Sequence, residues 1–384
     1  MLDRLAALVD AEYERGPIYT LFSNGRPISP TIDACERSVS WLNSVPGSER
    51  ARRWLLPLFH AGVWQLSRRL ARDHARRPYD LVISTSSSAI HTIRAPEGVP
   101  HICYCFTPPR YLWHLSDQYS SGLMGLGLKV CSPLLRRLDA RGAARVSVYL
   151  ADSNHTGEQI GRFYRRLWTT VFPPVRTQAF TPVPAPGEAP LDAADLATLR
   201  SLPPRFYLYA GALEPYKRGD LAVEVAAMLS EPVVIAGGGS QLERLRTQAA
   251  GRPGVTLLGR VSDALLRELY RRAIALLFPQ LEDFGIIPLE AQACGLPIVA
   301  YGKGGALDTV RDGVTGVFFA EQTAAAMAAA VPRCPTRPAC EHACRQNAER
   351  FSEAVFTDAM RGHIERALRR GESQQTKDAS HGDV

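Results

Sequence analysis

The chain has 384 residues, which exceeds what one hydrophobic core usually organises and is typical of two domains. Hydrophobic residues make up 46% and charged residues 22%, so the composition excludes an intrinsically disordered protein. The net charge of +7 favours a phosphate-bearing substrate or an anionic membrane as partner, and nucleic acid is disfavoured because no zinc-finger, RRM or homeodomain pattern occurs. No stretch approaches the roughly 18 consecutive apolar residues of a membrane-spanning helix, and no signal-peptide pattern opens the chain, which favours the cytoplasm.

The first clear helical pattern lies in residues 52–77, where apolar side chains recur at helical spacing with arginines dense on either side. One interpretation is a helix that packs on the core and has a solvated basic face. The other is a basic amphipathic surface that contacts an anionic bilayer. The apolar positions are Leu56, Phe59, Val63, Leu66 and Leu70.

Short β-branched or aromatic runs alternate with helical patterns along the rest of the chain. Most runs are apolar throughout, as expected of strands buried on both faces. Strands are predicted at 80–84, 101–106, 146–151, 206–210, 232–236, 255–258, 273–278 and 297–300, and helices at 220–229, 241–250, 262–272 and 288–294. These alternating units predict an α/β fold with parallel, doubly wound sheets.

A proline-rich stretch without periodicity, residues 172–190, is typical of an interdomain linker. It divides the chain into two Rossmann-like domains, residues 1–175 and 190–350, which are expected to face a cleft. Residues 351–370 are predicted to form a helix that packs back on the N-terminal domain, and residues 371–384 a disordered tail. Ligands of such sheets bind beyond the carboxyl ends of the strands.

The most informative motif follows the predicted strand at 273–278. A loop carries Glu282 and Gly285, and a helix starts near Pro288, where proline is tolerated in the first turn. The exposed N–H groups of this helix start can bind a phosphate without a metal. Glu290 lies eight residues after Glu282 and can accept hydrogen bonds from ribose hydroxyls. The alternative is a helix that merely carries acids near its N-terminus, which the helix dipole favours.

A second motif follows the predicted strand at 206–210, where Gly211 opens a loop that ends in Lys217 and Arg218. Two cations there can neutralise a pyrophosphate leaving group when no metal is used. The alternative is a solvated cationic pair at a helix start, which the helix dipole disfavours.

Three weaker patterns bear on which ligands and cofactors the chain could bind. The backbone of Gly259-Arg-Val-Ser can contact a nucleotide base. The Gly237-Gly-Gly-Ser-Gln turn lacks the G-x-G-x-x-G spacing of a dinucleotide loop, which disfavours NAD. No common zinc pattern matches the spacing C-x5-C-x-H-x-C of residues 334–344, so neither a metal nor a cofactor is expected.

Three motifs occur in order: Pro215-Tyr-Lys-Arg, the E-x7-E pair of Glu282 and Glu290, and Gly304-Gly-Ala-Leu-Asp-Thr-Val. This arrangement resembles the donor half of the family 4 retaining glycosyltransferases, which have the GT-B fold. The N-terminal segments 18–22, 79–86 and 103–113 resemble a subgroup that builds bacterial surface polysaccharides, often with GDP-mannose. The resemblance covers residues 1–365.

The resemblance implies that Lys217 and Arg218 bind the donor phosphates and that Glu290 binds the ribose. It places Glu282 and the Phe284–Ile287 backbone at the transferred sugar and the pyrophosphate. The catalytic candidates are Lys217, Arg218 and Glu282, the donor-binding candidates are Gly211, Val261, Phe284, Gly285, Ile286, Ile287 and Glu290, and the acceptor-side candidates are Thr107 and Arg110.

Enzymes of this kind retain the anomeric configuration through front-face attack assisted by the leaving phosphate. No protein carboxylate has to act as the nucleophile, in contrast to the glycosidases. The resemblance implies a metal-independent hexosyltransferase that moves mannose from GDP-mannose to a lipid-linked oligosaccharide in bacterial exopolysaccharide, lipopolysaccharide or O-antigen synthesis. With such an acceptor, we expect the protein in the cytoplasm or at the inner face of the plasma membrane.

Three departures from the family pattern keep an alternative open. Ala212 stands where the wider family has an arginine, and Phe106 stands in place of the histidine of Cys-His-Thr-Pro. The first strand of the N-terminal sheet is expected to be missing, because residues 1–8 resemble the helix that follows it. The alternative is a nucleotide-sugar-binding pseudoenzyme or a partner subunit of another transferase. A sugar epimerase or phosphorylase is disfavoured, since the acids or the pyridoxal lysine it needs are not matched.

Overall fold

The computed structural model describes residues 1–48, 52, 54–114 and 122–380. The chain forms two compact units. Unit 1 consists of residues 1–172 together with the chain from Phe356 onward, and unit 2 of Pro173–Val355. Within the described ranges, none of the helices is both long and apolar enough to cross a bilayer.

Unit 2 is built on one six-stranded parallel sheet with the order β12-β11-β10-β7-β8-β9. The strands are β7 Tyr207–Ala210, β8 Val233–Ala236, β9 Val255–Gly259, β10 Leu276–Phe278, β11 Ile298–Tyr301 and β12 Gly316–Phe319. Alternate residues of β7 enter two different cores, since Leu208 belongs to one apolar cluster and Tyr209 to the other. The sheet is therefore buried on both faces, which confirms the predicted doubly wound architecture.

Helices cover both faces of the unit 2 sheet. The α-helices are α9 Ala193–Ser201, α10 Gly219–Val225, α11 Leu242–Ala249, α12 Asp263–Arg272, α13 Ile286–Ala293, α14 Ala306–Thr309, α15 Ala324–Ala330 and α16 Arg337–Glu349, with 3-10 turns η4 Pro215–Lys217, η5 Ala226–Met228 and η6 Val331–Arg333. Residues 262–272 form α12 as predicted, because Ser262 caps its N-terminus and Leu265 and Leu269 face the core.

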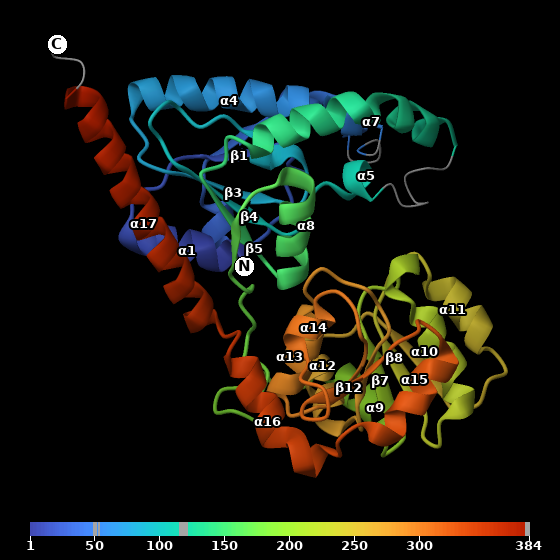
Figure 1. Cartoon of the computed structure of the whole chain (residues 1–384). Helices are drawn as coiled ribbons and strands as arrows, with labels where there is room; N and C mark the ends of the chain where they lie inside the picture. The colour runs from blue at the N-terminus through green and yellow to red at the C-terminus, as the bar shows by residue number, and fades with distance from the viewer. Residues whose placement is uncertain (49–51, 53, 115–121, 381–384) are drawn as a thin grey trace. The chain divides into compact units, whose positions relative to one another are not determined.

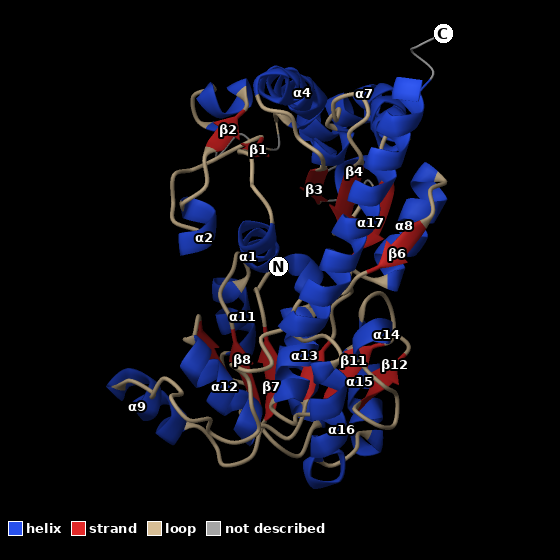
Figure 2. Ribbon diagram, turned by 90° about the vertical axis from the view of Figure 1, so that its left-hand side faces the viewer, coloured by secondary structure: helices blue, strands red, loops and turns tan. Residues whose placement is uncertain are grey.

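Unit 1 contains two separate parallel sheets. β3 Val82–Ser86, β4 His101–Cys105, β5 Val148–Ala151 and β6 Trp168–Thr170 form one sheet in that order, and β1 Ile18–Thr20 pairs with β2 Arg37–Val39 in the other (Figure 2). Among the strands of the described chain, none pairs with the second edge of β1 or of β3. The absence of a first strand in this sheet stays a prediction, whereas the predicted opening helix is confirmed as α1 Leu2–Glu12.

The helices of unit 1 pack against these sheets. The helices are α2 Pro30–Asp33, α4 Phe59–Arg76, α5 Arg110–Trp113, α7 Gly122–Ala143, α8 Asn154–Tyr164 and α17 Glu353–Ser380, with 3-10 turns η1 Trp41–Ser44, η2 Leu56–Leu58 and η3 Ala89–Thr92. All five apolar positions predicted for the first helical pattern are buried in one core cluster. The core-facing interpretation of that helix is thus confirmed.

Helix α17 belongs to unit 1 although it ends the chain. Its residues Phe356 and Met360 pack with Leu5 of α1 and Tyr104 of β4, and Arg361 forms an ion pair with Glu12 at 2.8 Å. Figure 1 shows α17 (red) and α1 (blue). The helix continues through Ser380, whereas the sequence predicted a disordered tail from residue 371 onward. Residues 381–384 lie outside the described chain.

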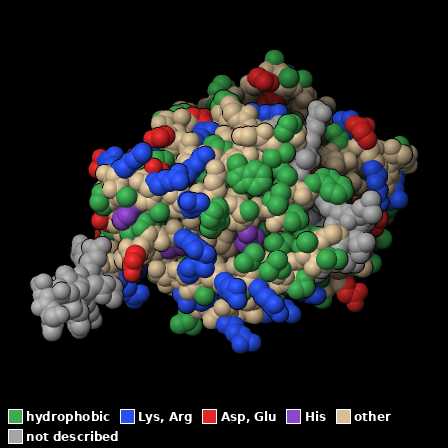
Figure 3. Space-filling view, turned by 90° about the horizontal axis from the view of Figure 1, so that it is seen from above, with side chains coloured by type: hydrophobic (Ala, Val, Ile, Leu, Met, Phe, Trp, Pro, Cys, Tyr) green, Lys and Arg blue, Asp and Glu red, His purple; other side chains and the backbone are tan. Residues whose placement is uncertain are grey.

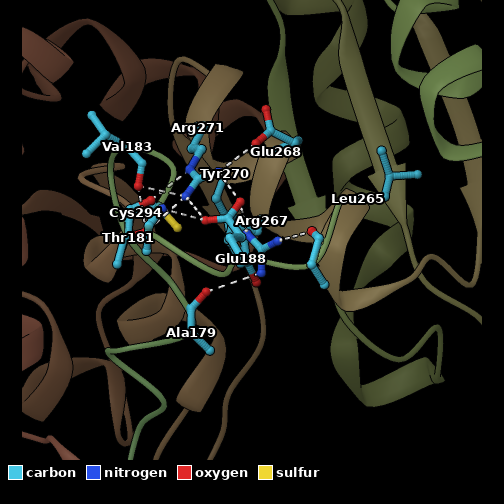
Figure 4. Close-up of polar contacts among 12 residues, drawn as sticks. Ala179, Thr181, Val183, Glu188, Leu265, Arg267, Glu268, Tyr270, Arg271 and Cys294 are labelled. Carbon is cyan, nitrogen blue, oxygen red and sulfur yellow. Dashed lines mark hydrogen bonds and ion pairs between the residues drawn. The ribbon is translucent and has the colours of Figure 1, made fainter. Parts of the chain in front are cut away.

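The proline-rich segment 173–190 is part of unit 2. Figure 4 shows that Arg271 of α12 contacts this segment. Arg271 donates to the carbonyl oxygens of Thr181 and Val183 at 2.8 and 2.9 Å. Its two terminal nitrogens, Nη1 and Nη2, each donate to the Glu188 carboxylate at 2.7 Å. Arg267 adds an ion pair to Glu188 at 2.8 Å. The hydrogen bonds from Arg271 lower the pKa of Glu188 to about 2. Unit 2 therefore begins at Pro173 instead of at residue 190.

Candidate functional site

Two glycine turns at the carboxyl ends of β7 and β8 bring the backbone of unit 2 into close contact. Gly211 follows β7 with φ 145°, a conformation that side chains other than glycine rarely adopt. A Cβ atom on Gly237, after β8, would lie 1.8 Å from the carbonyl oxygen of Gly211. Glycine is thus required where the two loops meet, at the edge where ligands of parallel sheets bind.

The structure brings together two predicted residues that lie 65 positions apart. The Lys217 ammonium at the end of η4 forms an ion pair with the Glu282 carboxylate in the loop after β10. Gln280 Nε2 donates to the same carboxylate oxygen at 2.9 Å. The Lys217 and Glu282 side chains are only 14% and 17% exposed, so water screens this pair weakly.

Arg218 is oriented differently from its neighbour. It has a left-handed conformation with φ 55°, and its guanidinium donates to both carboxylate oxygens of Asp220 at 3.0 to 3.2 Å. A further contact reaches the carbonyl oxygen of Gln322 at 3.4 Å. The charge of Arg218 is therefore paired with Asp220, while Lys217 is the cation directed at Glu282.

The N-terminus of α13 follows directly after this pair. Gly285 occupies the cap position with φ 93° and provides no side-chain cap, so the first N–H groups of the helix are not satisfied by a capping side chain. Ile286 is exposed, whereas Phe284 is buried against Phe351 with ring centroids 5.9 Å apart. The first N–H groups of α13 thus place a partial positive charge beside Lys217 and Glu282.

The third predicted motif supports the same loop. The Gly305 amide donates to the Glu282 carbonyl oxygen at 2.8 Å. A Cβ atom on Gly305 would lie 2.2 Å from the carbonyl oxygen of Phe284, and one on Gly304 would lie 2.4 Å from that of Glu282. The two consecutive glycines allow the 304–310 segment to fix the loop that carries Glu282.

Glu290 lies inside α13, in the second turn of the helix. Its side chain is buried and contacts Arg176 Nη2 at 3.4 Å, while Arg176 Nη1 contacts Asp263 at 2.7 Å. Burial raises the pKa of Glu290 to about 7, and the arginine opposes that shift. Val261, two residues before Asp263, is half-buried against the core. A carboxyl group that titrates near neutrality is characteristic of functional positions.

The acceptor-side candidates lie in unit 1, after β4. Thr107 is buried and donates to the Pro108 carbonyl oxygen at 3.2 Å, and Arg110 begins α5. Phe106 packs edge-on against Tyr104 with ring centroids 5.4 Å apart, and its carbonyl oxygen accepts from the Thr156 hydroxyl at 3.1 Å. The aromatic ring in the histidine position is thus integrated into the hydrophobic packing of this unit.

Sequence reasoning missed Gln280, Asp220 and Arg176 as partners of the site residues. Gln280 and Asp220 lie within two residues of Glu282 and Arg218, so the motif itself contained a signal for them. Arg176 lies in the irregular proline-rich segment, where no periodicity or motif marks it. Among the described residues, no group of three or more His, Cys, Asp or Glu side chains is placed to hold a metal ion.

Comparisons with known structures define the fold class. Sucrose-phosphate synthase from Thermosynechococcus elongatus superposes with a TM-score of 0.68 at 19% identity, covering 95% of this chain and 91% of the other. HepE of Anabaena in complex with UDP and glucose gives a TM-score of 0.63 at 15% identity, covering 94% and 95%. The chain has the GT-B fold, an α/β architecture with two Rossmann-like domains.

Sequence comparisons found a family model that matches the C-terminal part of the chain. Residues 197–351 match the family described as glycosyl transferases group 1. A D-inositol 3-phosphate glycosyltransferase of Mycolicibacterium paratuberculosis is 34% identical over 176 residues, which cover 42% of this chain and 40% of that protein. The chain thus spans about two fifths of the length of the curated relatives it matches. Residues 197–351 are thus similar to the glycosyl transferases group 1 family, in the part of the chain where the donor-half resemblance was found.

Proposed function

We propose that this protein transfers a sugar from a nucleotide-sugar donor bound in unit 2. The observation that carries the proposal is the Lys217–Glu282 pair beside the uncapped N-terminus of α13. An ammonium group and free helix N–H groups together form an anion site that suits a diphosphate. Glu290 lies farther along the same helix and is available to accept hydrogen bonds from ribose hydroxyls.

We propose a reaction that uses these groups and needs no protein nucleophile. Lys217 and the α13 N–H groups stabilise the charge that develops on the diphosphate as the bond to the anomeric carbon breaks. Glu282 keeps Lys217 in position and is directed toward the transferred sugar. We propose that the departing diphosphate accepts the acceptor proton on the same face, so the configuration is retained and no metal is needed.

The donor and acceptor belong to the same proposal. The resemblance of segments 18–22, 79–86 and 103–113 supports mannose from GDP-mannose and a polyprenol-linked oligosaccharide acceptor, with Thr107 and Arg110 on the acceptor side, in bacterial surface-polysaccharide synthesis. The HepE structure contains UDP, and the curated relatives are named D-inositol 3-phosphate glycosyltransferases. The competing proposal is therefore a UDP-sugar donor with a soluble acceptor. Contact with the anionic inner membrane would bring the protein to a lipid-linked acceptor.

A thermal-shift screen of GDP, GDP-mannose, UDP and UDP-glucose tests the donor, because a ligand stabilises the native state according to its affinity. We expect GDP and GDP-mannose to raise the Tm of the native chain and to lose that effect in Lys217→Ala. A shift with UDP compounds alone would overturn the mannose assignment and leave the transferase in place. No shift with any nucleotide would overturn the donor site.

The second candidate is a nucleotide-sugar-binding protein without turnover. The observation that favours it is Phe106, a partly buried ring that packs against the core where a histidine was expected. Radiolabelled transfer to extracted lipid acceptors separates the two candidates: binding without any product under saturating donor supports the second, and product formation excludes it.

A further inference from the structure

The outer side of α4 in unit 1 exposes large aromatic side chains. Trp64, on the helix itself, is 51% exposed, and Trp54, which precedes η2, is 63% exposed. Trp41 of η1 and Leu58 of η2 are exposed beside them. The Trp41 amide donates to the Gln65 side chain at 2.9 Å, which places η1 against α4 next to Trp64. Monomeric proteins rarely expose apolar groups in such concentration without a binding role.

Helix α7 continues the apolar surface. Val130, Leu134 and Leu138 follow one another at intervals of four residues, so they form one stripe along the helix. Val130 is 74% and Leu134 62% exposed. The opposite side of α7 is buried with α4 through Leu128 and Leu135. The stripe thus lies on the outside of the α4–α7 pair and is not required for their packing.

Basic side chains accompany these apolar groups, and acidic ones do not. The sequence has no Asp or Glu in residues 52–72 or 127–138. Arg68 lies over the Trp64 ring at 4.9 Å from its centroid, and Arg52, Arg72 and Arg137 are exposed. Figure 3 looks onto this side and shows hydrophobic side chains gathered next to lysine and arginine, with acidic groups mostly near the outline.

The C-terminal half of α4 adds a polar cavity of about 350 Å³. Four arginines and two carboxylates line it together with Pro17, Ser38 and Val39: Arg37, Arg69, Arg72, Arg76, Glu36 and Asp73. Arg69 donates to the Val39 carbonyl oxygen at 2.7 Å, but within the part of the chain that the structure describes Arg72 and Arg76 make no ion pair. Two guanidinium groups are thus free to bind phosphate oxygens.

We infer that the surface formed by Trp41, Trp54, Leu58, Trp64, Val130 and Leu134, here called the α4–α7 face, binds an anionic lipid bilayer. Tryptophan rings beside arginines are the side chains that partition into the headgroup region, where one end is apolar and the other is wet. The absence of acids over both segments favours anionic phosphate headgroups over a protein partner of mixed charge. This inference deepens the proposed function, because a membrane-bound acceptor requires such a contact.

The arrangement along α4 also sets how the face meets the bilayer. Apolar groups gather at the N-terminal end, at Trp54, Leu58 and Trp64, and cations follow toward the C-terminal end, from Arg68 to Arg76. The first group enters the interface, and the second remains at headgroup level, where each arginine contributes roughly a fivefold gain in partitioning. The face therefore combines a hydrophobic and an electrostatic signal, as stable peripheral binding requires.

Sedimentation with vesicles tests the inference on the full-length protein. We expect binding to vesicles of phosphatidylglycerol and phosphatidylcholine at equal parts, little binding to pure phosphatidylcholine, and loss of binding at 1 M salt, where charges are screened within about 3 Å. Trp54→Ser with Trp64→Ser should weaken binding roughly tenfold by removing interfacial aromatic area. Arg68→Glu with Arg72→Glu should weaken it at least as much.

Matched controls come from the same unit. Leu167→Ser changes a 92% exposed leucine outside the face, and Arg162→Glu changes an exposed arginine of α8. Both should bind vesicles as the native chain does. Every variant is also tested for its Tm and for its nucleotide-induced shift, which should be unchanged because the substitutions lie in unit 1.

Equal binding to both vesicle types, or native binding by the face variants, would overturn the inference. So would a chain that ignores vesicles and self-associates through this face, seen as dimers in sedimentation equilibrium that the same tryptophan variants abolish. A nucleotide shift that is absent while vesicle binding is intact would count against the proposed function alone. The two failures are thus distinguishable.

Discussion

The two units both pack helices on parallel sheets, but they differ in the size of the sheets and in the groups that are buried. In unit 2, a sheet of six strands is buried on both faces by two apolar clusters. In unit 1, two smaller sheets share a core that also contains a charged group: Asp139 of α7 is fully buried and accepts from Trp113 Nε1 and the Tyr164 hydroxyl, both at 2.8 Å. Unit 2 also contains a buried amide pair, in which Asn347 Nδ2 donates to Gln292 Oε1 at 2.8 Å, whereas the buried polar network of unit 1 is centred on a carboxylate.

The difference separates the functional surfaces as well. The candidate donor site of unit 2 combines loop residues at strand ends with the start of α13, and its charges form the pairs Lys217–Glu282, Arg218–Asp220 and Arg176–Glu290. The α4–α7 face of unit 1 is spread over helices and turns. Substitutions at the first should change chemistry and leave stability nearly intact, and the polar core of unit 1 should behave in the opposite way.

The largest expected effect is on turnover. Lys217→Ala removes the cation paired with Glu282 and should lower the transfer rate by about 10²–10³-fold, the range seen when one stabilising donor is removed from a transition state. The measurement is initial-rate kinetics with saturating nucleotide sugar. Arg244→Ala removes an exposed cation of α11 in the same unit and should leave the rate unchanged. A fall of less than threefold in Lys217→Ala would remove Lys217 from the mechanism.

The packing of unit 2 is tested by two adjacent glycines. Gly237→Ala places a Cβ atom 1.8 Å from the Gly211 carbonyl oxygen and should destabilise the protein by about 3 kcal/mol through overpacking. Gly238→Ala meets its nearest atom at 3.8 Å and should be close to neutral. Equilibrium denaturation in urea compares them. Equal stability of the two variants would show that the loops of β7 and β8 are not in close contact.

The polar core of unit 1 predicts an acid sensitivity. Hydrogen bonds and the nearby His91 and His60 lower the pKa of Asp139 below its usual value although burial alone would raise it. A folded-state pKa below the unfolded one contributes stability above about pH 4 that is lost as the pH falls further. Asp139→Asn should cost about 2 kcal/mol at pH 7 and much less at pH 3.

Urea denaturation at both pH values measures the Asp139 effect. Asp80→Asn, an exposed aspartate of the same unit without an ion pair among the described residues, serves as the control and should change stability little at either pH. A loss in Asp139→Asn that is the same at pH 3 and pH 7 would show that the ionised carboxylate is not what the network stabilises.

The smallest effect concerns the pH dependence of nucleotide binding. Since the pKa of Glu290 is raised to about 7, the carboxylate that we propose to accept from the ribose forms as the pH rises from 6 to 8, and nucleotide affinity should increase by about fivefold. Arg176→Met removes the group that opposes the shift, so the midpoint should move to higher pH. Glu290→Gln should abolish the dependence. Calorimetric titration at five pH values measures all three, and a flat native profile would contradict the assignment.

The sequence predicted unit 2 better than unit 1, for a physical reason. Strands covered on both faces are apolar throughout, and all eight predicted strands occur in the structure with shifted ends. The missed strands β1, β2 and β6 have three residues each, and none of their residues is fully buried. Such segments carry no periodic pattern. β12 was also missed; it opens on Gly316, and glycine is depleted in strands.

The site shows the same limit. The spacing of Lys217, Glu282 and Glu290 could be recognised because each motif is continuous in sequence. The Arg176–Glu290 contact spans 114 positions and joins an irregular segment to a helix, so it arises only from the folded chain. Likewise, the apolar spacing of α4 predicted its buried side, whereas the stripe on α7 became visible only once the structure showed which of its residues remain exposed.

Hydrogen–deuterium exchange of the native chain with and without a saturating nucleoside diphosphate locates the donor site without assuming the reaction. We expect slower exchange in residues 211–218 and 282–290 of unit 2 and no change in α4 of unit 1. Protection confined to unit 1, or protection of unit 2 that leaves both of those segments unchanged, would contradict it.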